Sequence, residues 1–259
     1  MNSPYSRRYY EGLKEDSAAS ARAVVPLLLQ LLPARSVIDV GCGSGTWARA
    51  YAEAGCDVLG VDGEVVRPDQ LLIPAERFVR RDLGQPLALD RRFDLVNCLE
   101  VAEHLDPARA AGFVADLTRL GEVVVFSAAV PGQGGTHHVN EQWPSYWIPL
   151  FRAAGFVAVD CLRWQLWQRD EVAWWYVQNM FVFIRETRLG DYPAARAAAR
   201  PLPPDLVHPR AYLRAAVPSE MSPRMLAEVL KALPHFPGKI LGRLRGESHQ
   251  RNPGPPPPR

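Results

Sequence analysis

Hydrophobic residues recur along the chain in two alternating patterns. Short apolar runs, typical of buried strands, alternate with longer stretches in which apolar residues recur at helical spacing. Such short buried strands joined by helices are typical of parallel βαβ units with right-handed crossovers and helices on both faces of the sheet. The pattern predicts an α/β fold with strands at residues 36–40, 57–61, 78–80, 93–98 and 122–128, and helices at residues 17–32, 46–54, 107–120 and 144–154.

The pattern changes after Gly155. Residues 156–166 and 176–186 are two β-rich runs with no helical pattern between them, so they predict an antiparallel hairpin at the edge of a mostly parallel seven-stranded sheet. From about Arg188 the composition shifts to alanine, proline and arginine. The predicted organisation is an N-terminal helical segment (1–34), an α/β domain (35–187), a basic helical extension (188–250) and a disordered Pro-rich tail (251–259).

Charge and cysteine content narrow the class of protein. Residues 1–190 carry 19 Lys and Arg against 23 Asp and Glu, whereas residues 191–259 carry 11 against 5, so the basic part is the tail. The four cysteines form no CxxC pair, which favours reduced thiols and a cytoplasmic protein. The longest apolar run, residues 24–32, is far short of the roughly 20 residues that a membrane-spanning helix needs. No export signal is expected.

The most informative stretch is VIDVGCGSGTW at residues 37–47, in which a buried strand runs into a glycine-rich turn and then a helix. Glycines let the backbone turn sharply and approach a ligand, and the helix N-terminus offers unpaired N–H groups. Dinucleotide-binding proteins favour the spacing GxGxxG. Here the glycines fall as GxGxG behind Asp39, which resembles motif I of class I S-adenosylmethionine-dependent methyltransferases.

This resemblance extends to three further positions. Asp62 ends the second strand, where the family places a carboxylate on the ribose hydroxyls, and Asp82 and Leu83 follow the third strand, where the family holds adenine. Residues 93–98, FDLVNC, resemble the fourth motif, whose strand end lines the cofactor. The resemblance implies a Rossmann-like methyltransferase domain at 35–187, with S-adenosylmethionine held by Asp39, Gly41, Gly43, Gly45, Asp62, Asp82, Leu83 and Leu99.

Two alternatives remain at this stage. The chain could be a nucleotide-binding protein of another class or a methyltransferase relative without activity. Tyr9 and Tyr10 lie in the N-terminal segment that often forms a lid over the cofactor in this superfamily, although surface aromatic residues on a helix explain them equally well.

A second cluster of candidate residues follows the fourth strand, in the sequence EVAEHL at residues 100–105. On a helical turn Glu100, Glu103 and His104 share one face, at the carboxyl end of the sheet, where open α/β folds bind ligands. Two carboxylates and an imidazole suit a divalent cation. The glycine-rich loop at residues 132–141 would bring one more histidine over the same site.

The ExxEH sequence resembles that of the metal-assisted O-methyltransferases of the ubiquinone pathway. Together with the later HxxE at residues 138–141, it resembles the small-RNA 3′-terminal 2′-O-methyltransferases, which are also metal-assisted. The resemblance implies that Glu100, Glu103, His104 and His138 bind Mg²⁺, Mn²⁺ or Zn²⁺. Such a cation lowers the pKa of an acceptor hydroxyl, and His137 would serve as general base. The alternative is catalysis without metal, with His104 or His138 as the base.

The predicted function is O-methylation of a small-molecule hydroxyl on a phenol, sugar or natural product. The aromatic residues of the downstream half would line the acceptor pocket or belong to the core. RNA-end methylation is an alternative, but the acidic body argues against nucleic acid; a non-catalytic binding module is another. Residues 221–244 suit a membrane-surface helix, although packing on the chain's own domain or in a homodimer is favoured.

Overall fold

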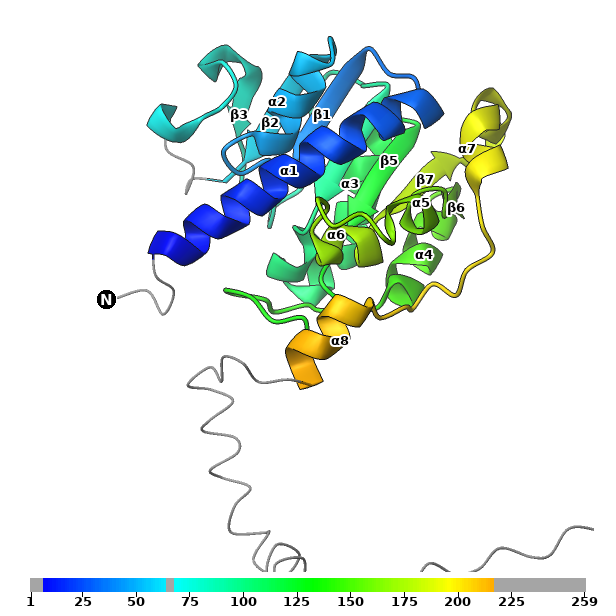
Figure 1. Cartoon of the computed structure of the whole chain (residues 1–259). Helices are drawn as coiled ribbons and strands as arrows, with labels where there is room; N and C mark the ends of the chain where they lie inside the picture. Colours follow the sequence, from blue (N-terminus) through cyan, green and yellow to red (C-terminus); the bar gives the residue numbers. More distant parts are fainter. Residues whose placement is uncertain (1–6, 64–67, 217–259) are drawn as a thin grey trace, which may run out of the picture. The chain divides into compact units, whose positions relative to one another are not determined.

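The computed structural model describes residues 7–63 and 68–216 (Figure 1). Its centre is a seven-stranded sheet in the order β3-β2-β1-β4-β5-β7-β6. Neighbouring strands are parallel except that β7 runs antiparallel to both β5 and β6. The strands are β1 (Ser36–Val40), β2 (Asp57–Asp62), β3 (Phe78–Arg80), β4 (Leu95–Leu99), β5 (Val123–Ser127), β6 (Phe156–Val159) and β7 (Phe181–Arg185). The predicted α/β fold is confirmed.

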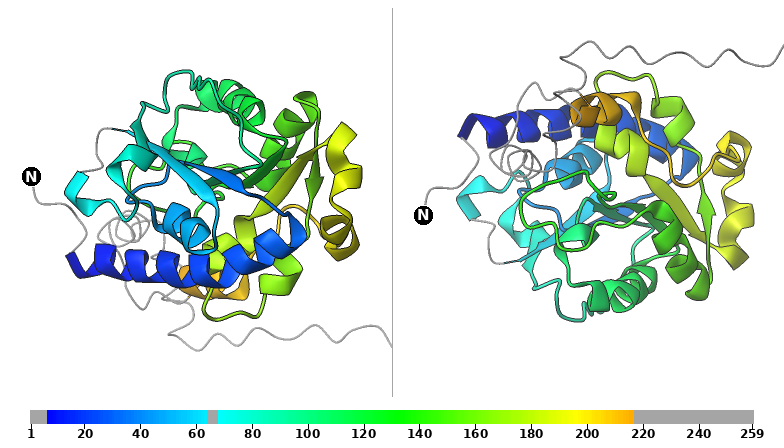
Figure 2. Two further views of the ribbon diagram at one scale, coloured as in Figure 1. Left: turned by 90° about the horizontal axis from the view of Figure 1, so that it is seen from above. Right: turned by 90° about the horizontal axis from the view of Figure 1, so that it is seen from below.

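Helices cover both faces of this sheet (Figure 2). Alternate residues of β1 point to opposite faces: Val37 belongs to the core under α1 and α2, whereas Ile38 and Val40 belong to the core under α3 and α4. The described helices are α1 (Arg7–Leu31), α2 (Thr46–Glu53), α3 (Ala110–Leu120), α4 (Pro144–Ala153), α5 (Arg163–Leu166), α6 (Trp174–Asn179), α7 (Pro193–Ala198) and α8 (Pro209–Ala216).

The connection between β6 and β7 differs from the prediction. The two strands do pair antiparallel at the edge, but they are shorter than the β-rich runs and are joined through α5 and α6. The predicted strand at residues 176–186 includes residues 176–179 of α6, a β-rich segment by its residue types. In the folded chain this segment is a short helix, and its residues Tyr176 and Val177 are buried in the core. Tertiary packing therefore outweighs the local preference for a strand.

Hydrogen bonds from the buried Arg163 side chain hold the segment after α7 in place. Its side chain is 0% exposed and donates two hydrogen bonds to Asp160 Oδ2, at 3.0 and 2.6 Å. It also donates to the carbonyl oxygens of Pro204 and Pro203, at 2.7 and 2.8 Å, and lies 4.2 Å from the centre of the Phe181 ring. A buried guanidinium needs such partners. The first compact unit extends to Tyr212. The predicted domain boundary at residue 187 stays a prediction.

The predicted helix at residues 221–244 and the predicted Pro-rich tail at 251–259 lie outside the residues that the structure describes. The side chains of Tyr9 and Tyr10, in α1, are also outside them. The helix α1 begins at Arg7, ten residues before the predicted start. None of the helices in the described ranges is long and apolar enough to cross a membrane.

Candidate functional site

The glycine-rich turn between β1 and α2 has the conformation that its sequence predicts. Gly41, Gly43 and Gly45 have φ angles of 76°, 53° and 88°, in the left-handed region that favours glycine. A Cβ atom on Gly41 would lie under 3.0 Å from two methyl carbons of Val101, whereas one on Gly43 would meet no atom within 4 Å. The turn is therefore packed against the protein at Gly41 and open to a ligand at Gly43.

Asp62 lies beside this turn because β1 and β2 are neighbours in the sheet. Its carboxylate accepts hydrogen bonds from the backbone N–H of Gly43 and of Gly63, both at 2.6 Å. The carboxylate thus sits at the open side of the turn, where the sequence predicts the ribose hydroxyls. Each oxygen keeps a second lone pair for a ligand.

Asp39 is turned into the protein. It is buried and accepts hydrogen bonds from Asn97 Nδ2 at 2.8 Å and from the Ala48 N–H at 3.1 Å. These bonds tie β1 to β4 and to the first turn of α2, so Asp39 positions the glycine-rich turn. Its predicted direct contact with a cofactor stays a prediction.

The remaining predicted cofactor residues lie along the carboxyl ends of β3 and β4. Asp82 is exposed and accepts a hydrogen bond from the Gly84 N–H at 2.9 Å, while Leu83 is buried. Leu99 is the last residue of β4 and is also buried. Because adjacent parallel strands end at one edge of the sheet, these residues line the same edge as Asp62 and the glycine-rich turn.

Burial of Asp39 makes stability pH-dependent. Burial raises the pKa of this carboxyl from 3.8 to about 7, and the nearby charge of Asp62 adds to the effect, against the hydrogen bonds from Asn97 and Ala48. Between about pH 4 and 7 the folded protein keeps a proton that the unfolded chain releases, so this group lowers stability as pH rises, by up to ~4 kcal/mol. We expect Asp39→Asn to flatten the decline in the free energy of unfolding between pH 5 and 8, measured by urea titration.

The control for this prediction is Asp57→Asn. The pKa of Asp57 is lowered, chiefly by its hydrogen bond with Arg91, so this exposed group favours the folded state at higher pH. Its removal should leave the decline in place. An unchanged pH slope in Asp39→Asn would contradict the assignment.

Three of the four predicted metal ligands come together. The ligand atoms of Glu103, His104 and His138 lie within 4.8 Å of one another. Glu103 and His104 belong to the short 3₁₀ turn η3 (Ala102–His104), and His138 comes from the glycine-rich loop after β5. The loop is fixed to the turn because the N–H groups of Val139 and Asn140 donate to the Glu103 carbonyl oxygen, at 2.8 and 3.0 Å.

The Glu103 carboxylate is the unusual group of this cluster. Its side chain is 0% exposed, and neither oxygen has a hydrogen-bond partner within the described part of the chain. Burial and the charge of Glu100 raise its pKa well above the ordinary value. The backbone N–H groups of Glu103 and Ala129 oppose this rise only in part. Burial and the charge of His138 lower the pKa of His104. A buried carboxylate that makes no full hydrogen bond is costly unless a cation or a proton compensates it, so the ligand set fits a divalent cation.

Glu141 orients His138, a role that the sequence analysis did not assign. The His138 Nδ1 lies 2.9 Å from Glu141 Oε1, and the Glu141 carboxylate also accepts hydrogen bonds from the N–H groups of Gly132 and Gly134, both at 2.8 Å. With Nδ1 engaged, Nε2 is the nitrogen left for a ligand. The HxxE spacing was the signal for this pair.

Glu100 does not join the other three predicted ligands. A shared face for Glu100, Glu103 and His104 needs a helical turn from residue 100, but η3 begins at Ala102 and Glu100 has a left-handed φ of 56°. Its carboxylate instead accepts hydrogen bonds from Gln133 Nε2 at 2.7 Å and Asn179 Nδ2 at 3.3 Å. Burial raises the pKa of Glu100 to about 7.

His137, the predicted general base, is also outside the cluster. It is exposed, at a left-handed position of the loop with φ 60°, and it is not one of the three grouped ligands, although its backbone and its charge both affect the pKa of His104. His104, by contrast, belongs to the cluster and is directly beside His138, with ring centroids 4.8 Å apart and planes at 88°.

Side-chain amides form a hydrogen-bond network that holds the Glu100 carboxylate. Asn179 Nδ2 donates to Gln133 Oε1 at 2.9 Å as well as to Glu100, and Gln178 Nε2 donates to Asn179 Oδ1 at 2.9 Å. The Gln178 oxygen accepts from the backbone N–H of His208 at 2.8 Å. This chain of hydrogen bonds connects the segment after α7 with the end of β4, and sequence spacing gave no indication of it.

We expect Asn179→Ala to destabilise the protein by about 2 kcal/mol, because the buried Gln178 Nε2 loses its acceptor and the half-buried Gln133 and Glu100 each lose one donor. Urea unfolding measures this cost. The matched control is Gln165→Ala, which removes one side-chain hydrogen bond, from Gln165 Nε2 to the Cys161 carbonyl oxygen. A loss no larger than that of the control would show that the network contributes little.

The aromatic residues of the downstream half divide between core and surface: Trp147 and Tyr176 are buried, whereas Tyr146 and Trp164 are exposed. Trp147 is buried on α4 with its ring centroid 5.2 Å from that of Phe126, and Tyr176 is buried with its ring edge on Trp47. A small void of about 10 Å³ beside Trp147 and Asn179 is too small for a ligand. Which of these residues lines an acceptor pocket stays a prediction.

The strand order with one antiparallel strand, together with a glycine-rich turn beside Asp62, defines the Rossmann-like fold of class I methyltransferases. A family model described as a methyltransferase domain matches residues 13–178, and the chain belongs to this family.

Similar proteins and solved structures agree with this assignment. The ubiquinone biosynthesis O-methyltransferase of Methylococcus capsulatus is 35% identical over 123 residues, covering 40% of this chain and 50% of that protein; the one of Alkalilimnicola ehrlichii is 38% identical over 104 residues, covering 37% and 42%. The chain thus spans about half the length, or less, of these curated relatives.

Among solved structures, a sugar N-methyltransferase from Streptoalloteichus has a TM-score of 0.53 at 20% identity, covering 71% of this chain and 97% of that one. DesVI of Streptomyces venezuelae has a TM-score of 0.52 at 17% identity, covering 68% and 94%. At these identities the likeness shows the fold.

Proposed function

We propose that the protein transfers the methyl group of S-adenosylmethionine to a hydroxyl oxygen of a small molecule, with a divalent cation held by Glu103, His104 and His138. The observation that carries the metal assignment is the fully buried Glu103 carboxylate, which has no hydrogen-bond partner in the described ranges and lies beside two imidazoles. Membership of the methyltransferase-domain family supports the cofactor.

The glycine-rich turn and the carboxyl ends of β2 and β3 are the proposed cofactor site. Gly43 leaves backbone open for a ligand, and Asp62 presents its carboxylate at the same place. Asp82 and Leu83 follow β3 at the same edge of the sheet, where an adenine would lie. Asp39 holds the turn in position through Asn97 and Ala48.

The proposed acceptor site is the Glu103–His104–His138 cluster. A bound cation supplies Lewis acidity that lowers the pKa of an acceptor hydroxyl and orients it. Glu141 keeps the His138 ring oriented, and the loop contacts to the Glu103 carbonyl hold the three side chains together. In the reaction the acceptor O–H would release its proton to water, the oxygen would bond to the methyl carbon, and the carbon–sulfur bond would break, its electron pair staying on the sulfur of S-adenosylhomocysteine.

One observation favours a second candidate mechanism, without metal. Burial and the charge of His138 lower the pKa of His104, so its imidazole is neutral near pH 7 and able to take the hydroxyl proton. Here His104 or His138 is the general base, and Glu103 carries a proton. Metal dependence of turnover separates the two mechanisms.

A small-molecule hydroxyl, on a phenol, a sugar or a natural product, is the proposed acceptor class. The relatives in Methylococcus and Alkalilimnicola are ubiquinone biosynthesis O-methyltransferases, which supports an oxygen acceptor. RNA-end methylation remains the alternative suggested by the HxxE spacing, but residues 1–190 are net acidic. A cytoplasmic location also remains an expectation.

Titration calorimetry with S-adenosylmethionine and S-adenosylhomocysteine, first with EDTA and then with Mg²⁺, Mn²⁺ or Zn²⁺ restored, tests the proposal. We expect low-micromolar cofactor binding and separate binding of at least one of the metal ions. Cofactor binding without any effect of metal on turnover of a catechol probe would favour the histidine-base mechanism. Absence of cofactor binding by the folded protein would overturn the proposed function.

A further inference from the structure

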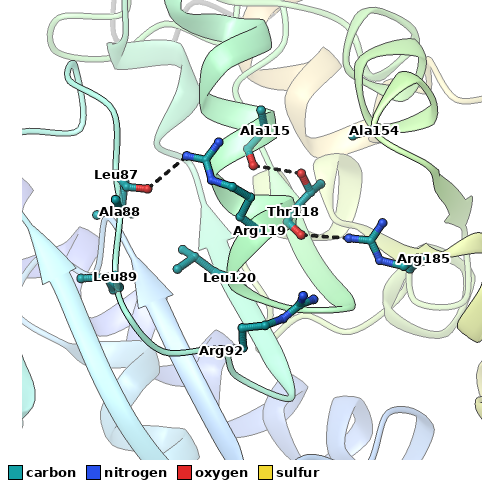
Figure 3. A pocket seen from close by; sticks show the side chains of 10 residues that line it. All are labelled: Leu87, Ala88, Leu89, Arg92, Ala115, Thr118, Arg119, Leu120, Ala154 and Arg185. Carbon is teal, nitrogen blue, oxygen red and sulfur yellow. Dashed lines mark hydrogen bonds between the residues drawn. The ribbon is translucent and has the colours of Figure 1, made fainter.

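A hollow lies at the amino ends of the parallel strands, whereas the proposed cofactor site lies at their carboxyl ends. Its volume is about 580 Å³, within the usual range for small-molecule sites. It is bounded by the ends of the chain segments that precede β4, β5 and β6 and by the end of the antiparallel β7, so it lies at the amino ends of the parallel strands. The residues that line it are Leu87, Ala88, Leu89, Arg92, Ala115, Thr118, Arg119, Leu120, Ala154 and Arg185 (Figure 3).

Three arginine side chains line this hollow. Arg119 comes from α3, Arg185 from β7 and Arg92 from the segment before β4 (Figure 3). Arg185 Nη2 donates to the Thr118 carbonyl oxygen at 3.2 Å, and Arg119 Nη2 to that of Leu87 at 3.4 Å. These bonds hold two of the three guanidinium groups, each at a different part of the lining (Figure 3).

The acidic partners of these arginines are too few to neutralise them. Arg92 and Arg185 share the single carboxylate of Glu122, one on each oxygen. Arg119 shares Asp116 with a fourth arginine, Arg109, again one on each oxygen. Among the ion pairs in the described ranges, the carboxylates of Glu122 and Asp116 are therefore each shared by two guanidinium groups. Each group of one carboxylate and two arginines has a net charge of +1.

The lining also includes apolar side chains. Leu87 and Leu120 are almost fully buried, so Leu89 and the small side chains of Ala88, Ala115 and Ala154 supply the exposed apolar part. Guanidinium groups bind carboxylate and phosphate oxygens with paired N–H donors, and each arginine here keeps donors that its ion pair does not use. The combination suits an anionic head on a compact apolar body.

We propose that this hollow, lined by Arg92, Arg119 and Arg185, is a binding site for a small oxyanion-bearing molecule with a compact apolar body. The site is separate from the methyl-transfer site, because the two lie at opposite ends of the parallel strands. It does not depend on the proposed catalytic function.

Calorimetry in low-salt buffer with benzoate, phenyl phosphate and inorganic phosphate tests this site. We expect benzoate or phenyl phosphate to bind with a Kd of about 1 mM or tighter. Tighter binding of benzoate indicates a carboxylate ligand, and tighter binding of phenyl phosphate a phosphate ligand. Inorganic phosphate should bind more weakly than phenyl phosphate, because it lacks the apolar body.

Two kinds of variant locate the binding. The double variant Arg92→Gln/Arg185→Gln should weaken it by about tenfold or more, since charge-assisted hydrogen bonds are lost. Ala88→Trp fills the hollow and leaves the ion pairs intact, and it should also abolish binding. His138→Ala, in the other site, should bind the probes like the wild type, as should the surface control Arg49→Gln, whose partner is Glu53.

Binding of S-adenosylhomocysteine and the melting temperature report whether each variant is folded. No binding of benzoate and phenyl phosphate at about 10 mM would overturn the proposal. Binding that survives in Ala88→Trp, or that is lost in His138→Ala, would place the probes elsewhere and would overturn it as well.

Discussion

Glu103→Gln should weaken metal binding by at least about 100-fold without destabilising the metal-free protein. A direct ligand contributes more than the outer residues, whose loss costs 10- to 100-fold. Because neither Glu103 oxygen has a hydrogen-bond partner in the described part of the chain, the amide loses none, and the expected change in stability is below about 1 kcal/mol. Metal titration calorimetry and urea unfolding in EDTA measure the two quantities.

The matched comparison for this prediction is Glu100→Gln. The sequence predicts that Glu100 is a ligand, whereas the structure turns its carboxylate to Gln133 and Asn179. We therefore expect Glu100→Gln to retain metal binding, and His138→Ala to lose it. Metal affinity should also fall as pH is lowered, because protons compete for Glu103 and His104. Undiminished metal binding in Glu103→Gln would contradict the proposed site.

Gly41→Ala should abolish cofactor binding. Its φ of 76° is costly for any L residue, and the new Cβ would lie under 3.0 Å from two methyl carbons of Val101. The turn must shift, which moves Gly43 and its hydrogen bond to Asp62. We expect the affinity for S-adenosylhomocysteine to drop by about 100-fold or more, which corresponds to ~2.7 kcal/mol. Calorimetry measures the affinity.

Gly55→Ala is the control for backbone strain. Gly55 follows α2 with a φ of 90°, and a Cβ there would meet no atom within 4 Å. This variant should lose about 1–2 kcal/mol of stability and bind the cofactor normally. If Gly41→Ala binds S-adenosylhomocysteine like the wild type while folded, the glycine-rich turn is not the cofactor site.

Local patterns predicted the sheet well where strands are buried and bounded by turns. The bounds of β1 and β3 match the prediction, and those of β2 differ by one residue. Local patterns failed between β6 and β7, because a run of aromatic residues is compatible with a strand and with a buried helix. Sequence spacing cannot distinguish the two when the segment is short and buried on most sides.

The sequence by itself determined the order of strands and helices, the glycine-rich turn and the residue types of the candidate site, because periodicity and glycine spacing are local properties of the chain. Only the tertiary structure decided which side chains meet. It brought His138 from a distant loop to Glu103, withdrew Glu100 through a left-handed backbone, and joined four arginines to two carboxylates. These contacts depend on loop conformation and on packing between residues far apart in the sequence, which local spacing does not encode.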